Sequence, residues 1–162
     1  MLSFRKVTIS EIPVVTLLAR EIWTVSYREM ISSAQIEYML NWMYAPATIE
    51  KEINEGVLWE FIEEGSLPIG FIAVTPDKDE LKLNKLYIDP TKQGKGFGQI
   101  ALQHVIDYGR NNGFKSVFLT VNKGNTKAIK AYTKAGFVCT NSKVFDIGGG
   151  YVMDDYIYTY VL

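Results

Sequence analysis

Hydrophobic and polar positions divide this chain into alternating runs that predict helices and strands. Apolar residues that recur every three or four positions indicate helices, and short alternating runs indicate strands. The helical pattern predicts five helices. The first begins after Ser10, and the second begins after Ser32 or Ser33 and ends at Pro46. The others cover Thr48–Asn54, the stretch from Phe97 to the stop signal Asn111-Asn112-Gly113, and Asn125–Ala135. The strand pattern covers Leu2–Ile9, Val57–Glu63, Leu67–Thr75, Leu81–Ile88, Ser116–Val121, Phe137–Asp146 and Tyr151–Val161.

The order of these elements predicts a single-domain α/β fold with a mixed sheet and helices on both faces. Most successive strands are joined by short turns, so the sheet should be mostly antiparallel. A helix separates the strands Leu81–Ile88 and Ser116–Val121, which predicts a central parallel pair joined by a right-handed crossover. Crevices at the carboxyl ends of such strands are favoured ligand sites.

A glycine-rich turn, Gln93-Gly94-Lys95-Gly96-Phe97-Gly98, lies between the first strand of this pair and the helix that follows. Such a turn exposes backbone N–H groups at a helix N-terminus, where the dipole also favours an anion such as phosphate. Lys92 and Lys95 add positive charge there. A Walker loop does not fit, because it needs Ser or Thr after Gly-Lys and here Gly96 follows Gly94-Lys95. A dinucleotide fingerprint needs Gly-x-Gly-x-x-Gly, whereas these glycines are all spaced by two.

The turn resembles the Gln/Arg-x-x-Gly-x-Gly/Ala signature of the GCN5-related N-acetyltransferases (GNAT family). The resemblance covers Leu81 to Phe137, and its second part is a Val-x-x-x-Asn-x-x-Ala-x-x-x-Tyr-x-x-x-Gly-Phe segment. The residues that match this segment are Val121, Asn125, Ala128, Tyr132 and Gly136-Phe137. The ending Gly150–Tyr156 is similar to that of bacterial polyamine-type acetyltransferases.

The resemblance implies one N-acetyltransferase domain over residues 1–162, with acetyl-coenzyme A as co-substrate and no metal. Carried over by position, the cofactor contacts would be Leu86, Tyr87, Ile88, Gln93, Gly94, Lys95, Gly96, Phe97, Gly98, Gln99, Asn125, Ala128 and Tyr132. In the family, the backbone at the positions of Leu86, Tyr87 and Ile88 holds the pantetheine arm, and an N–H there stabilises the oxyanion. Asn125 is also a good helix cap, and the two roles are compatible.

Tyr132 is the predicted general acid. An amine that attacks a thioester expels a thiolate whose conjugate acid has a pKa of about 8.5, so a phenol with a pKa of about 10 can donate a proton to it. The alternative interpretation is a core aromatic residue on the same helix face as Ala128 and Ala135.

The general base is left open by the sequence. Many members of the family carry a glutamate near the position of Asn84, and an asparagine cannot serve as a base at neutral pH. The proton can pass to a water relay, to Glu80, or to Asp154 or Asp155 on the last strand. No base is needed if the acceptor amine already has a low pKa.

Composition narrows the classes of protein further. The 162 residues suffice for one domain, and the net charge of −1 argues against a nucleic-acid surface. No apolar run resembles a leader or reaches membrane-spanning length, so we expect no membrane partner. Cys139 is the only cysteine, so no internal disulfide can form and we expect a cytoplasmic protein. We expect Cys139 to be a buried structural thiol. The aromatic final strand predicts a homodimer edge.

The sequence therefore predicts transfer of an acetyl group from acetyl-coenzyme A to a primary amine, by direct attack in a ternary complex. Nine glutamates but only two cations lie between Glu21 and Glu64, which favours a cationic acceptor such as a small polyamine-like amine or a peptide amine. The alternative is a non-catalytic sensor or docking domain that binds acetyl-coenzyme A. Binding of ATP or NAD is disfavoured by the mismatched glycine spacing.

Overall fold

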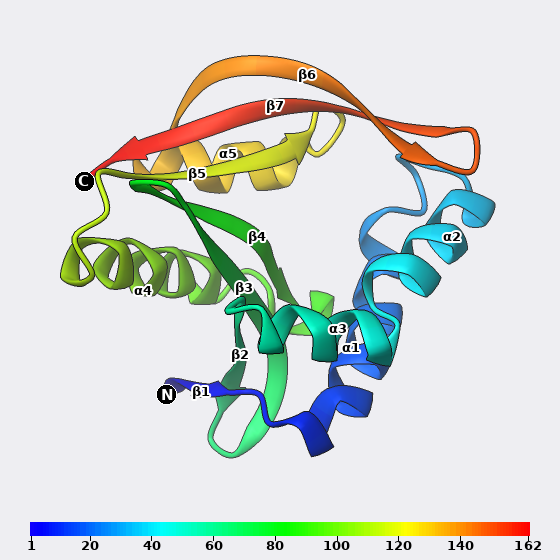
Figure 1. The fold of residues 1–162 in the computed structure, drawn as a ribbon, viewed down its shortest axis with the longest axis horizontal. Helices are drawn as coiled ribbons and strands as arrows, with labels where there is room; N and C mark the ends of the chain where they lie inside the picture. The colour runs from blue at the N-terminus through cyan, green and yellow to red at the C-terminus, as the bar shows by residue number, and fades with distance from the viewer. The chain divides into compact units, whose positions relative to one another are not determined.

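A computed structural model describes all 162 residues and contains five α-helices and seven strands (Figure 1). The helices are α1 (Ile12–Ser26), α2 (Ser33–Met43), α3 (Pro46–Asn54), α4 (Phe97–Asn111) and α5 (Thr126–Ala135). The strands are β1 (Leu2–Lys6), β2 (Leu58–Glu64), β3 (Leu67–Asp77), β4 (Glu80–Ile88), β5 (Ser116–Asn122), β6 (Val138–Gly148) and β7 (Tyr151–Val161). No helix is long and apolar enough to cross a membrane.

The seven strands form one mixed sheet in the order β1-β2-β3-β4-β5-β7-β6. β4 and β5 pair in parallel, in a register that runs from Glu80–Ser116 to Lys82–Phe118. The β1–β2, β2–β3, β5–β7 and β6–β7 pairs are antiparallel. The predicted α/β fold with a mostly antiparallel sheet and one parallel pair is confirmed.

The chain divides into two compact units. The first consists of residues Met1–Val74 and Lys85–Phe97, and the second of Thr75–Asn84 and Gly98–Leu162. β3 and β4 each contribute residues to both units, because the boundaries fall inside these strands.

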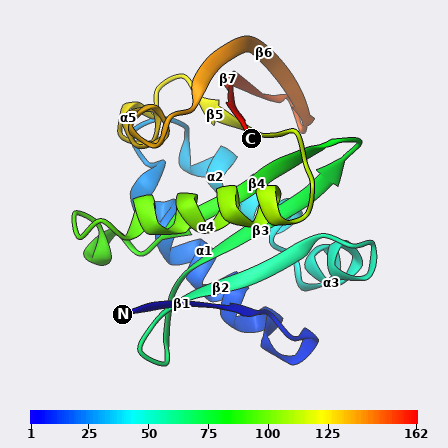
Figure 2. The ribbon, with the colours of Figure 1, turned by 90° about the vertical axis from the view of Figure 1, so that its left-hand side faces the viewer.

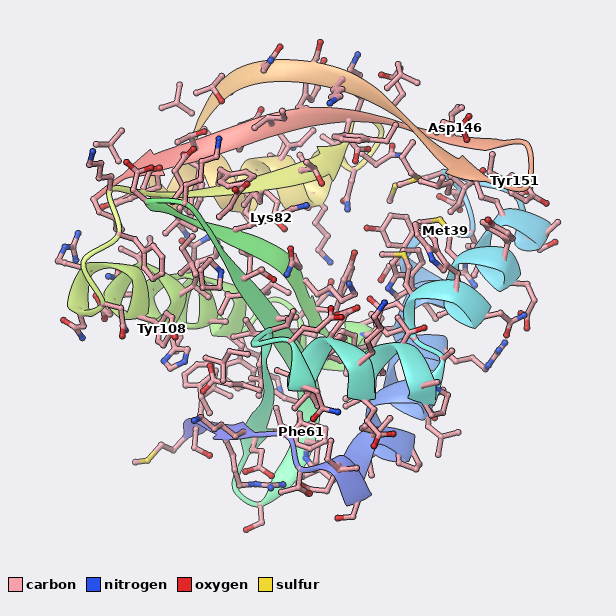
Figure 3. All side chains as sticks on the ribbon, in the orientation of Figure 1. Met39, Phe61, Lys82, Tyr108, Asp146 and Tyr151 are labelled. Carbon is pink, nitrogen blue, oxygen red and sulfur yellow. The ribbon has the colours of Figure 1, made fainter.

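Aromatic side chains form much of the core of the first unit. Trp23 of α1, Tyr44 after α2, and Trp59 and Phe71 of β2 and β3 are all at most 2% exposed. The Tyr44 ring lies 5.7 Å from Trp23 and 5.6 Å from Phe71, and the indole Nε1 of Trp23 donates a hydrogen bond to its hydroxyl at 3.0 Å. β1 and β2 run side by side in Figure 2, and Figure 3 labels the fully buried Phe61 on β2.

The second unit is built around β5 and the long β6–β7 hairpin. α4 approaches β5 closely at Gly109, where an added Cβ would lie 3.2 Å from a Val117 methyl group. α5 lies along β5 in Figures 1 and 2, and it ends at Gly136, whose backbone has a φ of +103° beside the Tyr160 ring. Asp146 lies near the tip of the hairpin, as labelled in Figure 3.

Some local predictions differ from the structure. β1 ends at Lys6 rather than Ile9, because Ile9–Glu11 forms a 3-10 helix. α3 begins at Pro46 rather than Thr48, because proline is well tolerated in the first helical turn, where its missing N–H would have no partner. The prediction that Cys139 is buried is wrong. Its thiol is exposed because β6 is an edge strand, and most of the residues in that strand face solvent.

Candidate functional site

The glycine turn is a sharply bent and exposed segment. Gly94 and Gly96 have φ values of +80° and +81°, a region that other residues avoid, and both are exposed. Nothing lies within 4 Å of the place where a Cβ would be at Gly94, Gly96 or Gly98, so conformation rather than crowding requires glycine at the first two. Phe97 begins α4, and the first N–H groups of this helix have no partner within the helix.

The end of β4 is fixed to the turn and to β3. The Gln93 side-chain amide donates a hydrogen bond to the Ile88 carbonyl at 3.2 Å. The Asp89 N–H donates to the Ile69 carbonyl at 2.7 Å, and the Asp89 carboxylate accepts from the Thr91 N–H at 2.9 Å. Gln93, a predicted cofactor contact, therefore positions the chain around the end of β4.

Leu86, Tyr87 and Ile88 occupy the last three positions of β4, as predicted. β3 approaches this segment so closely that a Cβ on Gly70 would lie 2.2 Å from the Tyr87 carbonyl oxygen. The Tyr87 hydroxyl lies 3.0 Å from that of Tyr27, which fixes its side chain against the end of α1.

The charge around the turn is smaller than the sequence indicates. Lys92 Nζ forms an ion pair with Glu64 at 2.8 Å, and this bond lowers the pKa of the Glu64 carboxyl. Lys95 also lowers the pKa of that carboxyl, through its nearby charge, but it is itself exposed. Lys95 therefore provides cationic charge at the turn, while the charge of Lys92 is largely compensated.

The segment between β5 and α5 positions two further predicted contacts. The Asn125 side chain accepts a hydrogen bond from the Ala128 N–H at 3.2 Å and so caps α5. Lys123 ties this segment to β7, because its N–H donates to the Asp154 carbonyl at 3.1 Å and its Nζ lies 2.8 Å from the Asp154 carboxylate.

One hydrogen bond links the start of α4 to α5, at the residue before Tyr132. The Gln99 side-chain amide in the first turn of α4 donates a hydrogen bond to the Ala131 carbonyl at 2.9 Å. Tyr132 is the next residue of α5, and its half-buried ring lies 6.0 Å from that of Phe137. The start of α4 is thus linked directly to the residue before the predicted general acid.

The residues considered as a general base lie in different surroundings. Asn84 hydrogen-bonds the Thr75 hydroxyl, and Glu80 accepts from Ser116 Oγ at 2.5 Å where β4 and β5 begin, at the end opposite to the predicted crevice. Asp154 is exposed and paired with Lys123. Asp155 is 6% exposed, and its burial could not be predicted without knowing the register of β7.

Comparison with known proteins identifies the family of this chain. The family model described as "Acetyltransferase (GNAT) family" matches residues 18–137. The peptidyl-lysine N-acetyltransferase YjaB of Salmonella typhimurium is 30% identical over 107 residues, which are 65% of this chain and 68% of the relative. The spermidine N(1)-acetyltransferase of Thermoplasma acidophilum is 26% identical over 144 residues, which are 84% of this chain and 88% of the relative.

Solved structures show the same fold over the whole chain. The PaiA N-acetyltransferase of Thermoplasma acidophilum, determined in complex with coenzyme A, superimposes with a TM-score of 0.84 at 24% identity and covers 100% of this chain and 99% of its own. The ribosomal-protein-S18-alanine N-acetyltransferase of Escherichia coli has a TM-score of 0.74 at 18% identity, with coverage of 99% and 94%. Because the family model matches most of its length, this chain belongs to the GNAT family of acetyltransferases.

Proposed function

We propose that this protein transfers the acetyl group of acetyl-coenzyme A directly to a primary amine in a ternary complex, with residues 1–162 acting as one catalytic domain. The observation that carries the proposal is the 2.9 Å hydrogen bond from Gln99 to the Ala131 carbonyl. It joins the first turn of α4, where a diphosphate would bind, to the helix that carries Tyr132.

The glycine turn suits a diphosphate. Gly94 and Gly96 are exposed and have no neighbour where a side chain would be, so phosphate oxygens can approach their backbone. Lys95 adds charge, and the first N–H groups of α4 supply donors. Leu86, Tyr87 and Ile88 would hold the pantetheine arm through their backbone, as the family resemblance implies.

The proposed chemistry needs one acid and one acceptor amine. The neutral amine attacks the acetyl carbonyl carbon, a C–N bond forms, and the C–S bond breaks. The Tyr132 hydroxyl gives its proton to the departing sulfur, and the proton that the amine nitrogen loses passes by way of solvent to restore that hydroxyl. The products are an amide and the free thiol of coenzyme A, so atoms and charge balance.

A small polyamine-like amine or a peptide amine is the proposed acceptor. The relatives named for spermidine and for peptidyl-lysine acetylation support this class. The acidic stretch supports it less than the sequence indicates, because many of its carboxylates have partners inside the protein. Glu37 pairs with Arg20, Glu63 with Arg5, Glu64 with Lys92 and Glu55 with Lys51, while Glu52 accepts from the Trp59 indole.

An amine panel with a thiol-release readout tests the proposed function. We expect release of coenzyme A thiol in the presence of spermidine or a lysine peptide, and tight binding of coenzyme A but not of ATP or NAD in a parallel titration. Binding of coenzyme A without thiol release for any amine would favour a non-catalytic sensor. Preference for an uncharged aromatic amine over spermidine would contradict a cationic acceptor.

Gly96→Ala is expected to weaken coenzyme A binding at least tenfold. An alanine at a φ of +81° costs about 1–2 kcal/mol and relaxes by rotating the N–H groups that face the phosphates. Gly113→Ala is the matched control, because Gly113 has a φ of +78°, is exposed and has no neighbour within 4 Å. Both variants should lose similar stability, and only Gly96→Ala should lose affinity in calorimetric titration. Equal affinities would show that the turn does not bind the cofactor.

The predicted homodimer stays a prediction. Apolar side chains gather on the β6–β7 hairpin and at its base, where Val138, Val144, Val152 and Val161 are 64%, 59%, 54% and 80% exposed. The edge of β6 also leaves backbone groups without strand partners, which is the usual setting for association.

A further inference from the structure

Asp155 is a buried carboxylate that is only partly hydrogen-bonded. Its side chain is 6% exposed, and its Oδ1 has no hydrogen-bond partner, the only buried side-chain oxygen or nitrogen in this state. A buried acceptor without a partner costs about 1–3 kcal/mol, and more when it is charged. Folding gains nothing from this arrangement, so it calls for another explanation.

No cation forms an ion pair with Asp155. Thr120 of β5 hydrogen-bonds the carboxylate, which is consistent with their positions on the same face of the β5–β7 pair. Lys123 is paired with Asp154, 2.8 Å away. Lys143 of β6, opposite Asp155 in the β6–β7 register, lies with its Nζ 5.2 Å from the Phe145 ring.

The electrostatic consequence is a carboxyl group that titrates close to neutral pH. Burial, and then the neighbouring charge of Asp154, raise the pKa of Asp155 to about 6, against smaller lowering effects of Thr120 and Lys123. The group is therefore ionised at pH 7 to 8, and its basicity is in the range where a general base works best.

Asp155 lies at the carboxyl end of β5. It is paired with Asn122, the last residue of that strand, and the chain continues through Asn125 into α5. The start of α5 and Asp155 thus meet at the end of the strand where ligands are favoured.

The two faces of the β5–β7 pair separate this carboxylate from the helices. Val117 and Tyr160 oppose each other and face α4 and Gly136. Successive side chains of a strand point to opposite faces of the sheet. Asp155 is five positions from Tyr160, and the β5–β7 register has no shift between them. The Asp155 side chain is therefore on the face opposite to Tyr160. A base on this face and an acid from α5 would approach the end of β5 from two sides, so that separate groups could take the proton from the amine and give one to the sulfur.

We propose that Asp155 is the general base of the acetyl transfer, and that its Oδ1 accepts the proton that the amine nitrogen loses as the C–N bond forms. The inference rests on the proposed function. Tyr132 gives its proton to sulfur in the same cycle, after which Asp155 releases its proton to solvent and Tyr132 regains one. Glu80, Asn84 and Asp154 are engaged elsewhere, so Asp155 is the carboxylate that remains.

The test compares Asp155→Asn with Asp154→Asn in the full-length protein. We expect Asp155→Asn to lower kcat by about 100-fold or more, with coenzyme A affinity unchanged. The wild-type kcat/KM should decline below about pH 6, and Asp155→Asn should lack this decline. Asp154→Asn removes the adjacent exposed charge that helps to raise the pKa of Asp155, so its kcat at pH 8 should stay within about threefold of wild type while its acidic limb moves to lower pH. Asp155→Glu should retain an acidic limb in the pH profile.

Thermal unfolding shows that the variant is folded. The folded-state pKa of Asp155 is raised to about 6, whereas an aspartate in the unfolded chain has a pKa of about 4. The cost of ionising Asp155 is therefore fully present above pH 6 and disappears below about pH 3, where the carboxyl is neutral in both states. Asp155→Asn should unfold at a higher temperature than wild type at pH 8 and at an equal temperature at about pH 3.

Three results would overturn the inference. Wild-type kcat with an intact acidic limb in Asp155→Asn would remove Asp155 from the reaction. A raised KM with unchanged kcat would make it an anionic binding group rather than a base. A wild-type protein that acetylates no amine would refute the proposed function itself, and the base with it.

Discussion

Tyr132→Phe should lower kcat by about 100-fold or more while the dissociation constant for coenzyme A stays unchanged. In the proposed reaction the phenol supplies a proton to the departing thiolate, which phenylalanine cannot do. The ring should remain in place, because its contact with Phe137, with centroids 6.0 Å apart, needs no hydroxyl. Thiol-release kinetics and calorimetric titration measure the two quantities separately.

Tyr160→Phe is the control for this result. The Tyr160 ring also contacts that of Phe137, with centroids 5.5 Å apart, and this substitution likewise removes only a hydroxyl. Its kcat should stay within about threefold of wild type. Unchanged turnover in Tyr132→Phe would show that another group, or water, protonates the sulfur.

Gly70→Ala should destabilise the protein by about 3 kcal/mol, which lowers the midpoint of thermal unfolding by about 6–12 °C for a chain of this size. The added Cβ would lie 2.2 Å from the Tyr87 carbonyl oxygen and 3.1 Å from the Ile88 Cα, both backbone atoms that cannot rotate away. β3 must therefore move from the end of β4. Because Leu86, Tyr87 and Ile88 are the proposed contacts of the pantetheine arm, coenzyme A binding should weaken as well.

Gly109→Ala is the control for Gly70→Ala, because the Cβ added at Gly109 would meet side-chain atoms rather than backbone atoms. Its Cβ would meet the ends of Leu162 and Val117 at 3.0 and 3.2 Å, and such side chains can shift. Alanine also favours the helix by up to about 1 kcal/mol, so the net change should be small. If urea unfolding gave Gly70→Ala the same stability as Gly109→Ala, the close approach of β3 to Tyr87 would be disproved.

The parts of the fold that depend on local pattern were predictable. Strong periodicity located α4 and α5, and the helix between β4 and β5 correctly predicted their parallel pairing. The ends of elements were less certain. α3 begins at Pro46, two residues before the predicted start. A proline can end one helix or begin the next, and the residue type alone does not tell which role it has.

Features that depend on contacts distant in sequence were not predictable. The ion pair of Lys92 with Glu64 joins residues 28 positions apart, and it removes charge that the sequence assigns to the glycine turn. The exposure of Cys139 follows from the edge position of β6, which hydrophobicity does not reveal. The choice among three carboxylates required the register of β7, which buries Asp155 and leaves Asp154 in solvent.

The interleaved composition of the two units affects how the protein can be dissected. Each unit combines a long segment with a short one, and the short ones, Lys85–Phe97 and Thr75–Asn84, are neighbours in the chain. A single cut after Val74 or after Phe97 therefore deprives at least one unit of its short segment, and no contiguous fragment contains one unit alone. One proteolytic cut or one deletion boundary therefore cannot yield both units intact, and during synthesis the first unit is complete only at Phe97, after the short segment of the second unit has been made.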